Sequence, residues 1–188
     1  MQRLIPRAKQ QQRGFTLIEV ILVVLIVGII ISMAGLSVNQ GGIERLLAED
    51  AKGVAAKLKL LSEEATLTGH QYAIRIHQQG MEYWLYEEQN WLPLKGDRAY
   101  RPKQWKGAYR IALKVEEDKA EIPPKDALQP VPQIYFFSSG ELTAFTLLLA
   151  LDDSVTSEHT PSWLIQGVPT GKIEVRRASE EEIGYSAL

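Results

Sequence analysis

The chain has 188 residues, with 21 basic and 23 acidic side chains that give a net charge of −2, and it contains no cysteine. The lack of cysteine excludes a disulfide framework, so no covalent cross-link can hold the fold together in an oxidising compartment. The slightly acidic balance argues against a surface that binds phosphate groups strongly.

The first 14 residues form a basic segment. Arg3, Arg7, Lys9 and Arg13 carry four positive charges there, and no acidic residue offsets them. Basic residues that flank an apolar helix stay on the cytoplasmic side, so we expect everything after Leu36 to lie across the inner membrane. Without this segment the chain keeps 17 basic and 23 acidic residues, a net charge of −6. That balance argues further against a nucleic-acid partner.

Residues 15–36 form an apolar run of 22 residues whose one charged side chain, Glu19, stands near its start. At the rise of about 1.5 Å per residue of a helix, the run spans roughly 33 Å, which matches a hydrocarbon core of about 30 Å. Many of its residues are β-branched, but a lone segment in lipid must satisfy its own backbone hydrogen bonds and therefore forms a helix. We predict a transmembrane helix over residues 15–36.

The order of the elements at this end differs from that of an ordinary secretory signal. Such a signal is cut after its apolar stretch, whereas here the small residue Gly14 precedes the stretch. The segment Gly-Phe-Thr-Leu-Ile-Glu, residues 14–19, resembles the type IV prepilin signature. The resemblance implies that a prepilin peptidase cleaves between Gly14 and Phe15 and then methylates the new amino group of Phe15. Residues 1–14 would then be a leader peptide, and the apolar helix would be kept.

Glu19 allows two interpretations. A carboxylate near a helix N-terminus is stabilised by the helix dipole, and this side chain could simply sit at the membrane interface. The resemblance favours a role in subunit assembly, in which Glu19 pairs with the positively charged amine of Phe15 on a neighbouring subunit. A charge inside an apolar helix is costly, which makes such a residue a candidate functional site.

Residues 37–69 are predicted to continue the helix outside the membrane. Apolar positions recur there at steps of three and four, as expected for one helical face that packs on a sheet: Ile43, Leu47, Ala51, Val54, Leu58, Leu61 and Ala65. The pair Gly41-Gly42 is a weak point and a candidate hinge, because internal glycine costs about 1 kcal/mol relative to alanine. Gly69 is a plausible helix stop.

After Gly69 the pattern changes to short apolar or alternating segments separated by Gly, Pro, Asp and Ser, which predicts antiparallel strands. The expected strands are residues 72–76, 81–87, 108–115, 134–137, 143–151, 162–166 and 172–176. Two segments that contain proline, 91–107 and 116–133, are expected to be ordered surface loops. The predicted fold class is α+β, with the long N-terminal helix packed on a β-sheet or β-sandwich domain formed by residues 70–188.

Three stretches of the second half, residues 82–94, 134–151 and 171–175, resemble the pseudopilin H family of the type II secretion system. In the second of them Ser139-Gly140 is expected to turn the chain and Phe145 to start a buried strand. The resemblance implies a minor pseudopilin near the tip of a short periplasmic fibre that helps to move exoproteins across the outer membrane. It also implies as partners the major pseudopilin, the minor pseudopilins of types I, J and K, and the prepilin peptidase. The chain would be a single-pass protein of the bacterial inner membrane with its C-terminal domain in the periplasm.

No residue pattern predicts catalysis, a cofactor or a metal site. The three histidines, His70, His77 and His159, lack metal-ligand spacing. His70 and His77 are expected to be surface or rim residues. Residues 167–172 resemble a phosphate-binding loop but are one residue short, and a β-turn is the preferred interpretation. The adjacent acids Asp152 and Asp153 offer too few oxygen ligands for calcium.

Two other functions stay open. The first is a type IV pilus minor pilin that serves pilus assembly or DNA uptake, which would use Lys172, Arg176 and Arg177, although the three acidic residues at 180–182 oppose phosphate binding. The second is a membrane-tethered periplasmic enzyme, which ranks last because no catalytic constellation is visible. A pseudopilin that is not an enzyme is the preferred prediction.

Overall fold

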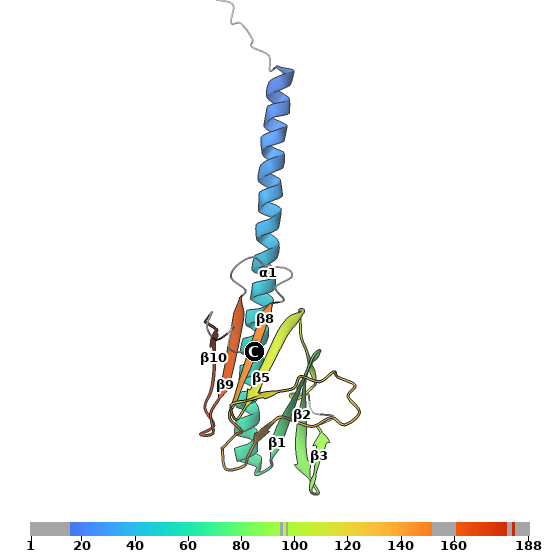
Figure 1. Ribbon diagram of the computed structural model, residues 1–188, viewed down its shortest axis with the longest axis vertical. Coiled ribbons are helices and arrows are strands. Elements are labelled where there is room, and N and C mark those ends of the chain that lie inside the picture. Colours follow the sequence, from blue (N-terminus) through green and yellow to red (C-terminus); the bar gives the residue numbers. More distant parts are fainter. Residues whose placement is uncertain (1–15, 95, 97, 152–160, 180–181, 183–188) are drawn as a thin grey trace, which may run out of the picture. The chain divides into compact units, whose positions relative to one another are not determined.

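The computed structural model describes residues 16–94, 96, 98–151, 161–179 and 182, and for residues 32–41 it describes the backbone alone (Figure 1). The described residues form one long helix and ten strands. The chain separates into two compact units, whose boundary lies between Gly41 and Gly42. The second unit contains all of the strands and the whole hydrophobic core.

The helix α1 extends over Leu17–Thr68 and is unbroken at Gly41 and Gly42, where the sequence suggested a hinge. It ends where the sequence predicted. Gly69 adopts a left-handed conformation with φ of 73°, and its N–H donates to the carbonyl oxygen of Ala65 at 3.1 Å. A residue with a side chain adopts this conformation only at a cost, which explains why glycine stands directly after the last helical turn.

Two antiparallel sheets make up the rest of the second unit. Sheet A has the strand order β3-β2-β1-β7, and β4 pairs with the first residues of β2, Gly80 and Met81. Its strands are β1 (Tyr72–His77), β2 (Gly80–Glu87), β3 (Asn90–Pro93), β4 (Lys103–Gln104) and β7 (Ile134–Phe136). Sheet B has the order β10-β9-β8-β5-β6, with β5 (Tyr109–Val115), β6 (Asp118–Ala120), β8 (Phe145–Leu151), β9 (Ser162–Gly167) and β10 (Ile173–Arg177). The predicted α+β class is therefore confirmed.

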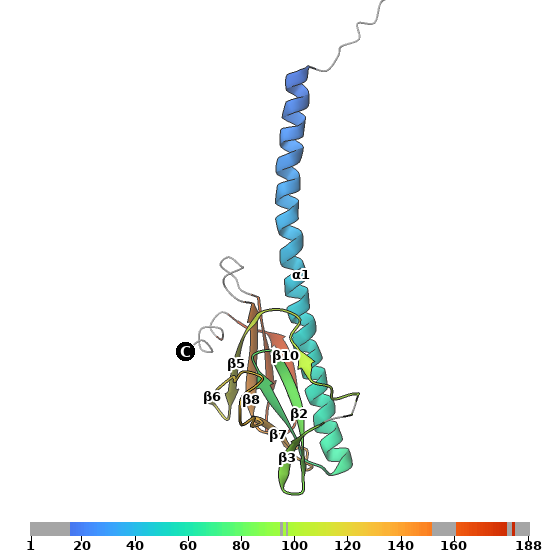
Figure 2. The same ribbon diagram turned by 90° about the vertical axis from the view of Figure 1, so that its right-hand side faces the viewer.

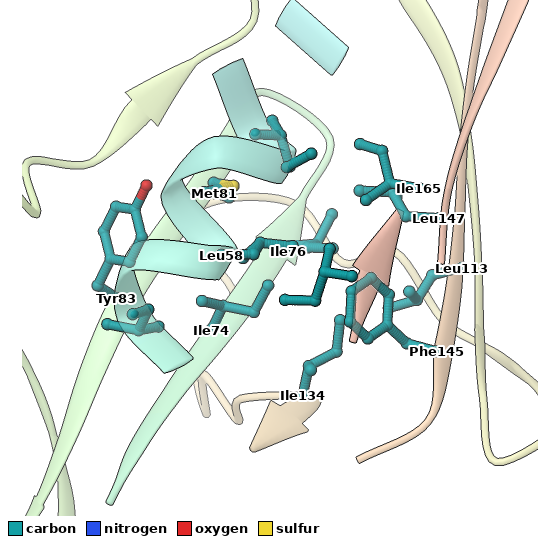
Figure 3. Close-up of a cluster of buried hydrophobic side chains, with 14 of the residues drawn as sticks. Leu58, Ile74, Ile76, Met81, Tyr83, Leu113, Ile134, Phe145, Leu147 and Ile165 are labelled. Carbon is teal, nitrogen blue, oxygen red and sulfur yellow. The ribbon is translucent and has the colours of Figure 1, made fainter. Parts of the chain in front are cut away.

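Figure 2 shows the C-terminal part of α1, within the second unit, running beside the sheets. The helical face predicted from the apolar spacing is the face that packs on them. Six side chains of this face are fully buried, with 0 % exposure: Leu47, Ala51, Val54, Leu58, Leu61 and Ala65. Ile43 packs against the same cluster. Figure 3 shows Leu58 of α1 among side chains of sheet A, such as Ile76, and of sheet B, such as Leu147. Helix and sheets therefore share one core.

Three short strands lie in segments that the sequence predicted as loops. β3 and β4 belong to the segment 91–107 or its edge, and β6 belongs to the segment 116–133. β3 and β6 each follow a two-residue turn in which both central residues have positive φ: Glu88 and Gln89 at 48° and 63°, and Glu116 and Glu117 at 52° and 73°. Turns of this type match the twist of a hairpin, so they continue each sheet by one more strand.

Candidate assembly interface

The N-terminus of α1 carries its own cap. The backbone N–H of Glu19 donates to the carbonyl oxygen of Thr16 at 3.1 Å, and it also lies 3.4 Å from the Thr16 hydroxyl. Thr16 is therefore the capping residue and Glu19 stands in the first turn, where the helix dipole favours a negative charge. The carboxylate of Glu19 is exposed, and no partner for it is found among the described residues.

Apart from Glu19, the first turns of α1 are apolar on every side. Thirteen large aliphatic residues are between 47 and 77 % exposed: Leu17, Ile18, Val20, Ile21, Leu22, Val23, Val24, Leu25, Ile26, Val27, Ile29, Ile30 and Ile31. A helix that is hydrophobic all round is stable when other apolar groups surround it, in a membrane or among other helices. In the part of the chain that the structure describes, no helix is long and apolar enough to count as a membrane span.

Gly14 and Phe15, the predicted cleavage and methylation residues, lie outside the described residues. The same is true of His159, Asp152 and Asp153. Their predicted roles, or lack of one, stay predictions.

Within the second unit, α1 is tied to its own domain by a buried carboxylate, Asp50, whose exposure is 0 %. Three donors from one stretch of chain converge on it. Lys103 Nζ donates to Oδ1 at 2.7 Å, the backbone N–H of Lys106 to Oδ2 at 2.8 Å, and the Tyr109 hydroxyl to Oδ2 at 3.1 Å. A buried charge is tolerated when it is paired and fully hydrogen-bonded, which is the arrangement here.

The Asp50 contacts fix the connection between β4 and β5 against the helix. Burial, and then the nearby Asp50 carboxylate, raise the pKa of Tyr109, so its hydroxyl stays protonated and donates. About two turns further along α1, Lys57 Nζ donates to the carbonyl oxygen of Ala99 at 2.6 Å. The long segment before β5 is thus held on α1 at several points. Sequence patterns did not predict these contacts, because their partners lie far apart along the chain.

A second polar cluster lies on the face of sheet A that faces away from α1. The Arg75 guanidinium, 1 % exposed, donates to Glu82 at 3.3 Å and to the carbonyl oxygens of Pro124 and Lys125 at 2.8 and 3.1 Å. Next to it, Gln133 bonds both the N–H and the carbonyl of Ile76, at 2.8 and 3.0 Å. These bonds hold the segment between β6 and β7 over the sheet.

His77 belongs to the same face, and the expectation that it lies at the surface is wrong, because it is 2 % exposed. Its Nδ1 accepts from the backbone N–H of Gln79 at 3.2 Å, and its Nε2 is 3.9 Å from Glu82. Burial lowers the pKa of His77, while Glu82 opposes this shift. The segment that carries Pro124 covers it, which alternation along the strand could not reveal. His70, in contrast, is exposed as predicted.

The remaining sequence candidates fall into structural roles. Residues 168–171 form the turn between β9 and β10, in which the Gly171 N–H donates to the Val168 carbonyl at 3.0 Å. Two of the three cations considered for DNA binding are paired with acids: Lys172 with Glu174 at 2.6 Å, and Arg176 with Glu182 at 2.8 Å. This pairing reduces the positive charge available to a phosphate backbone.

Comparisons with known proteins identify the family of this chain. The prokaryotic N-terminal methylation motif matches residues 9–35. Type II secretion system protein H of Pseudomonas aeruginosa is 32 % identical over 143 residues, which cover 73 % of this chain and 83 % of that protein. The chain belongs to the type II secretion system protein H family. The protein of the same name from Escherichia coli is 30 % identical and covers 74 % of this chain and 82 % of its own length.

The fold of this family member agrees with a solved structure. The crystal structure of the minor pseudopilin EpsH from the type II secretion system of Vibrio cholerae superposes with a TM-score of 0.59 at 20 % identity, and the match covers 73 % of this chain and 98 % of that one. At this identity the likeness establishes the fold alone. The family membership predicted from the sequence is thus confirmed by the relatives, and the α+β architecture by the structure.

Proposed function

We propose that this family member is a minor pseudopilin, a structural subunit near the tip of the periplasmic fibre of a type II secretion system. The observation that carries the proposal is the combination of a capped, all-round apolar N-terminal helix with a family match that spans most of the chain. Such a helix has to be surrounded by apolar groups, and a helical fibre core supplies them after the membrane has done so. The role is mechanical and involves no catalytic step.

The proposal gives the N-terminal residues specific roles. The peptidase would cut between Gly14 and Phe15 on the cytoplasmic side, residues 15–36 would anchor the protein in the inner membrane, and the β-rich domain would lie in the periplasm. The methylated amine of Phe15 would meet Glu19 of a neighbouring subunit. The exposure of Glu19 and its place in the first helical turn support this pairing, because none of the described residues pairs with the carboxylate and it is accessible to a cation of a neighbouring subunit.

The proposed neighbours are the major pseudopilin and the minor pseudopilins of types I, J and K. The ion pairs at Lys172 and Arg176 argue against a nucleic-acid partner and therefore against the alternative of a minor pilin for DNA uptake.

A clean deletion of the gene, scored for two outputs in the same cells, tests the proposed function. Exoprotein release and pilus-dependent motility or DNA uptake are measured together. We expect exoproteins to be trapped in the periplasm while the pili work normally. Normal secretion with lost pili or lost uptake would overturn the proposal and favour the minor pilin.

The proposed role of Glu19 is tested separately with Glu19→Ala. We expect normal cleavage and membrane insertion but weaker incorporation into the fibre, measured by crosslinking to other subunits. Glu63→Ala, which removes an exposed carboxylate from the same helix, is the matched control. Equal incorporation of the two variants would show that Glu19 has no role in assembly.

The cleavage site is tested with Gly14→Val. We expect this variant to accumulate in the membrane as the heavier precursor, which the intact mass of the purified protein reports. A mature mass identical to that of the parent protein would show that the peptidase does not depend on Gly14.

A further inference from the structure

A groove of about 450 Å³ lies against β1 and β2 of sheet A. Two long segments form its walls. The segment between β3 and β4 contributes Tyr100, Arg101 and Pro102, and the segment between β6 and β7 contributes Lys125 and Pro130. Arg75 of β1 and Trp84 of β2 line it from the sheet. A concavity of this volume is within the range of sites that bind ligands or peptide segments.

Two hydrogen-bond donors beneath this groove have no acceptor in the part of the chain that the structure describes. Arg75 is 1 % exposed and Trp84 is 5 % exposed, and neither Arg75 Nε nor Trp84 Nε1 finds a partner among the described residues. The two residues are diagonal neighbours on one face of the sheet, because Ala73 pairs with Trp84 and Arg75 pairs with Glu82. Buried donors are nearly always satisfied in folded proteins, so two of them at one groove are a sign of a missing acceptor.

The other groups of the Arg75 guanidinium are already engaged. They hold Glu82 and the carbonyl oxygens of Pro124 and Lys125, which fixes the wall of the groove to the sheet. The wall is therefore preorganised, and preorganisation lowers the entropy lost on binding. An occupant does not need to build the site. It needs to supply oxygen acceptors to these two donors.

The rim of the groove is positively charged. Arg101 and Lys125 are both exposed and positive, and neither side chain forms an ion pair with a described residue. The acid that lines the groove, Glu82, is already bonded to Arg75. The described lining thus offers donors and positive charge together with apolar proline and aromatic surface, and the complementary occupant is acidic and rich in acceptors.

We propose that this groove binds an acidic, extended segment of a second protein, whose carboxylate or carbonyl oxygens accept from Trp84 Nε1 and Arg75 Nε while Arg101 and Lys125 attract its charge. An extended backbone presents carbonyl oxygens at regular intervals, and grooves lined by aromatic residues accommodate such segments. The inference rests on the proposed function in one respect, since a fibre subunit has protein neighbours in the periplasm. It adds the surface and the chemistry by which one of them is recognised.

The experiment uses the full chain in cells, with a photoreactive benzoylphenylalanine placed at one position at a time. Pro102, which lines the groove, reports on the occupant, and Lys119 on β6 is the control position on sheet B. A third position, Leu25 on the apolar helix, reports on incorporation into the assembly. Crosslinked segments are mapped by mass spectrometry, and the mapped segment is then synthesised as a peptide and titrated against the full chain in detergent.

We expect the adduct from position 102 to map to a segment that contains aspartate or glutamate in a protein other than this chain. We expect Lys125→Glu to weaken peptide binding about three- to tenfold, while Lys119→Glu leaves it unchanged. Trp84→Phe, which removes the indole donor and keeps an aromatic ring, should weaken it about threefold, and Trp163→Phe on sheet B should not. Lys125→Glu changes an exposed side chain, so it tests the proposal even if Trp84→Phe fails to fold.

Other outcomes would overturn the inference. These are an adduct with a second copy of this chain, with lipid or with nucleic acid, a mapped segment without acidic residues, or equal affinities for Lys125→Glu and Lys119→Glu. Adducts from Leu25 to other pseudopilins without any adduct from position 102 would reject the groove and leave the proposed function intact. Absence of adducts from both positions would contradict the proposed function as well.

Discussion

Replacing Asp50 by asparagine tests whether a buried carboxylate holds α1 to its domain. The substitution keeps the shape of the side chain but removes its charge and turns one acceptor oxygen into an N–H donor. Asp50 has 0 % exposure and accepts from Lys103 Nζ, the Lys106 N–H and the Tyr109 hydroxyl. The amide can satisfy at most the donors on one side, and its NH2 group will face a donor on the other.

The expected loss follows from these contacts. Breaking a buried ion pair by removing one partner costs about 3–5 kcal/mol. The Lys103 side chain is 21 % exposed and can turn toward water, which recovers part of that loss. We therefore expect Asp50→Asn to lower the free energy of unfolding by about 2–4 kcal/mol, or the melting temperature by roughly 4–16 °C for a domain of this size.

The assay is thermal and denaturant unfolding of the full chain in mild detergent, followed by tryptophan fluorescence. Glu49→Gln is the matched control, because it makes the same chemical change at the next residue. Glu49 forms its ion pairs with Lys106 and Arg45 in solvent, at 3.0 and 3.1 Å, and its loss should leave the unfolding midpoint unchanged. Equal midpoints for the two variants would refute the reasoning that burial makes the Asp50 contacts stabilising.

Three further predictions concern the core, a close backbone approach and a buried histidine. Leu58→Ala should lower the free energy of unfolding by about 2–5 kcal/mol, whereas Leu60→Ala, which is 39 % exposed on the same helix, should cost less than about 1 kcal/mol; similar values would place the core elsewhere. Gly80→Ala should destabilise by about 1–3 kcal/mol, because its Cβ would overlap the carbonyl oxygen of Lys103, while Gly53→Ala has open space and should stabilise the helix by about 0.5–1 kcal/mol in the same denaturant titration. Burial lowers the pKa of His77 below its ordinary value of 6.5. As the pH falls below 6.5, the unfolded chain therefore binds a proton at this residue more readily than the folded chain does, and the free energy of unfolding decreases. His77→Asn should reduce this fall between pH 7 and pH 5 and His70→Asn should not, which unfolding midpoints measured across that range will check.

The apolar spacing of α1 was enough to predict which face is buried, because the face repeats over several turns and each step agrees with the helical period. The same kind of reasoning located β1, β5 and β8, whose branched and aromatic residues lie between clear turn residues. The hairpins that add β3 and β6 were missed. Their turns are Glu88-Gln89 and Glu116-Glu117, which adopt positive φ without the glycine or asparagine that marks such turns in a sequence.

The sequence by itself determined the family, the α+β class and the apolar N-terminal helix with Glu19 near its start, because these depend on local order and periodicity along the chain. Only the tertiary structure decided which polar residues are buried. Asp50, Arg75 and His77 look like solvated side chains in the sequence, yet all three are buried. A segment at least 49 residues away along the chain supplies hydrogen-bond partners to Asp50 and to Arg75, whereas the Nδ1 of His77 accepts from nearby Gln79. Contacts of that separation leave no periodic trace, since they are fixed by how helix, sheets and loops close on one another.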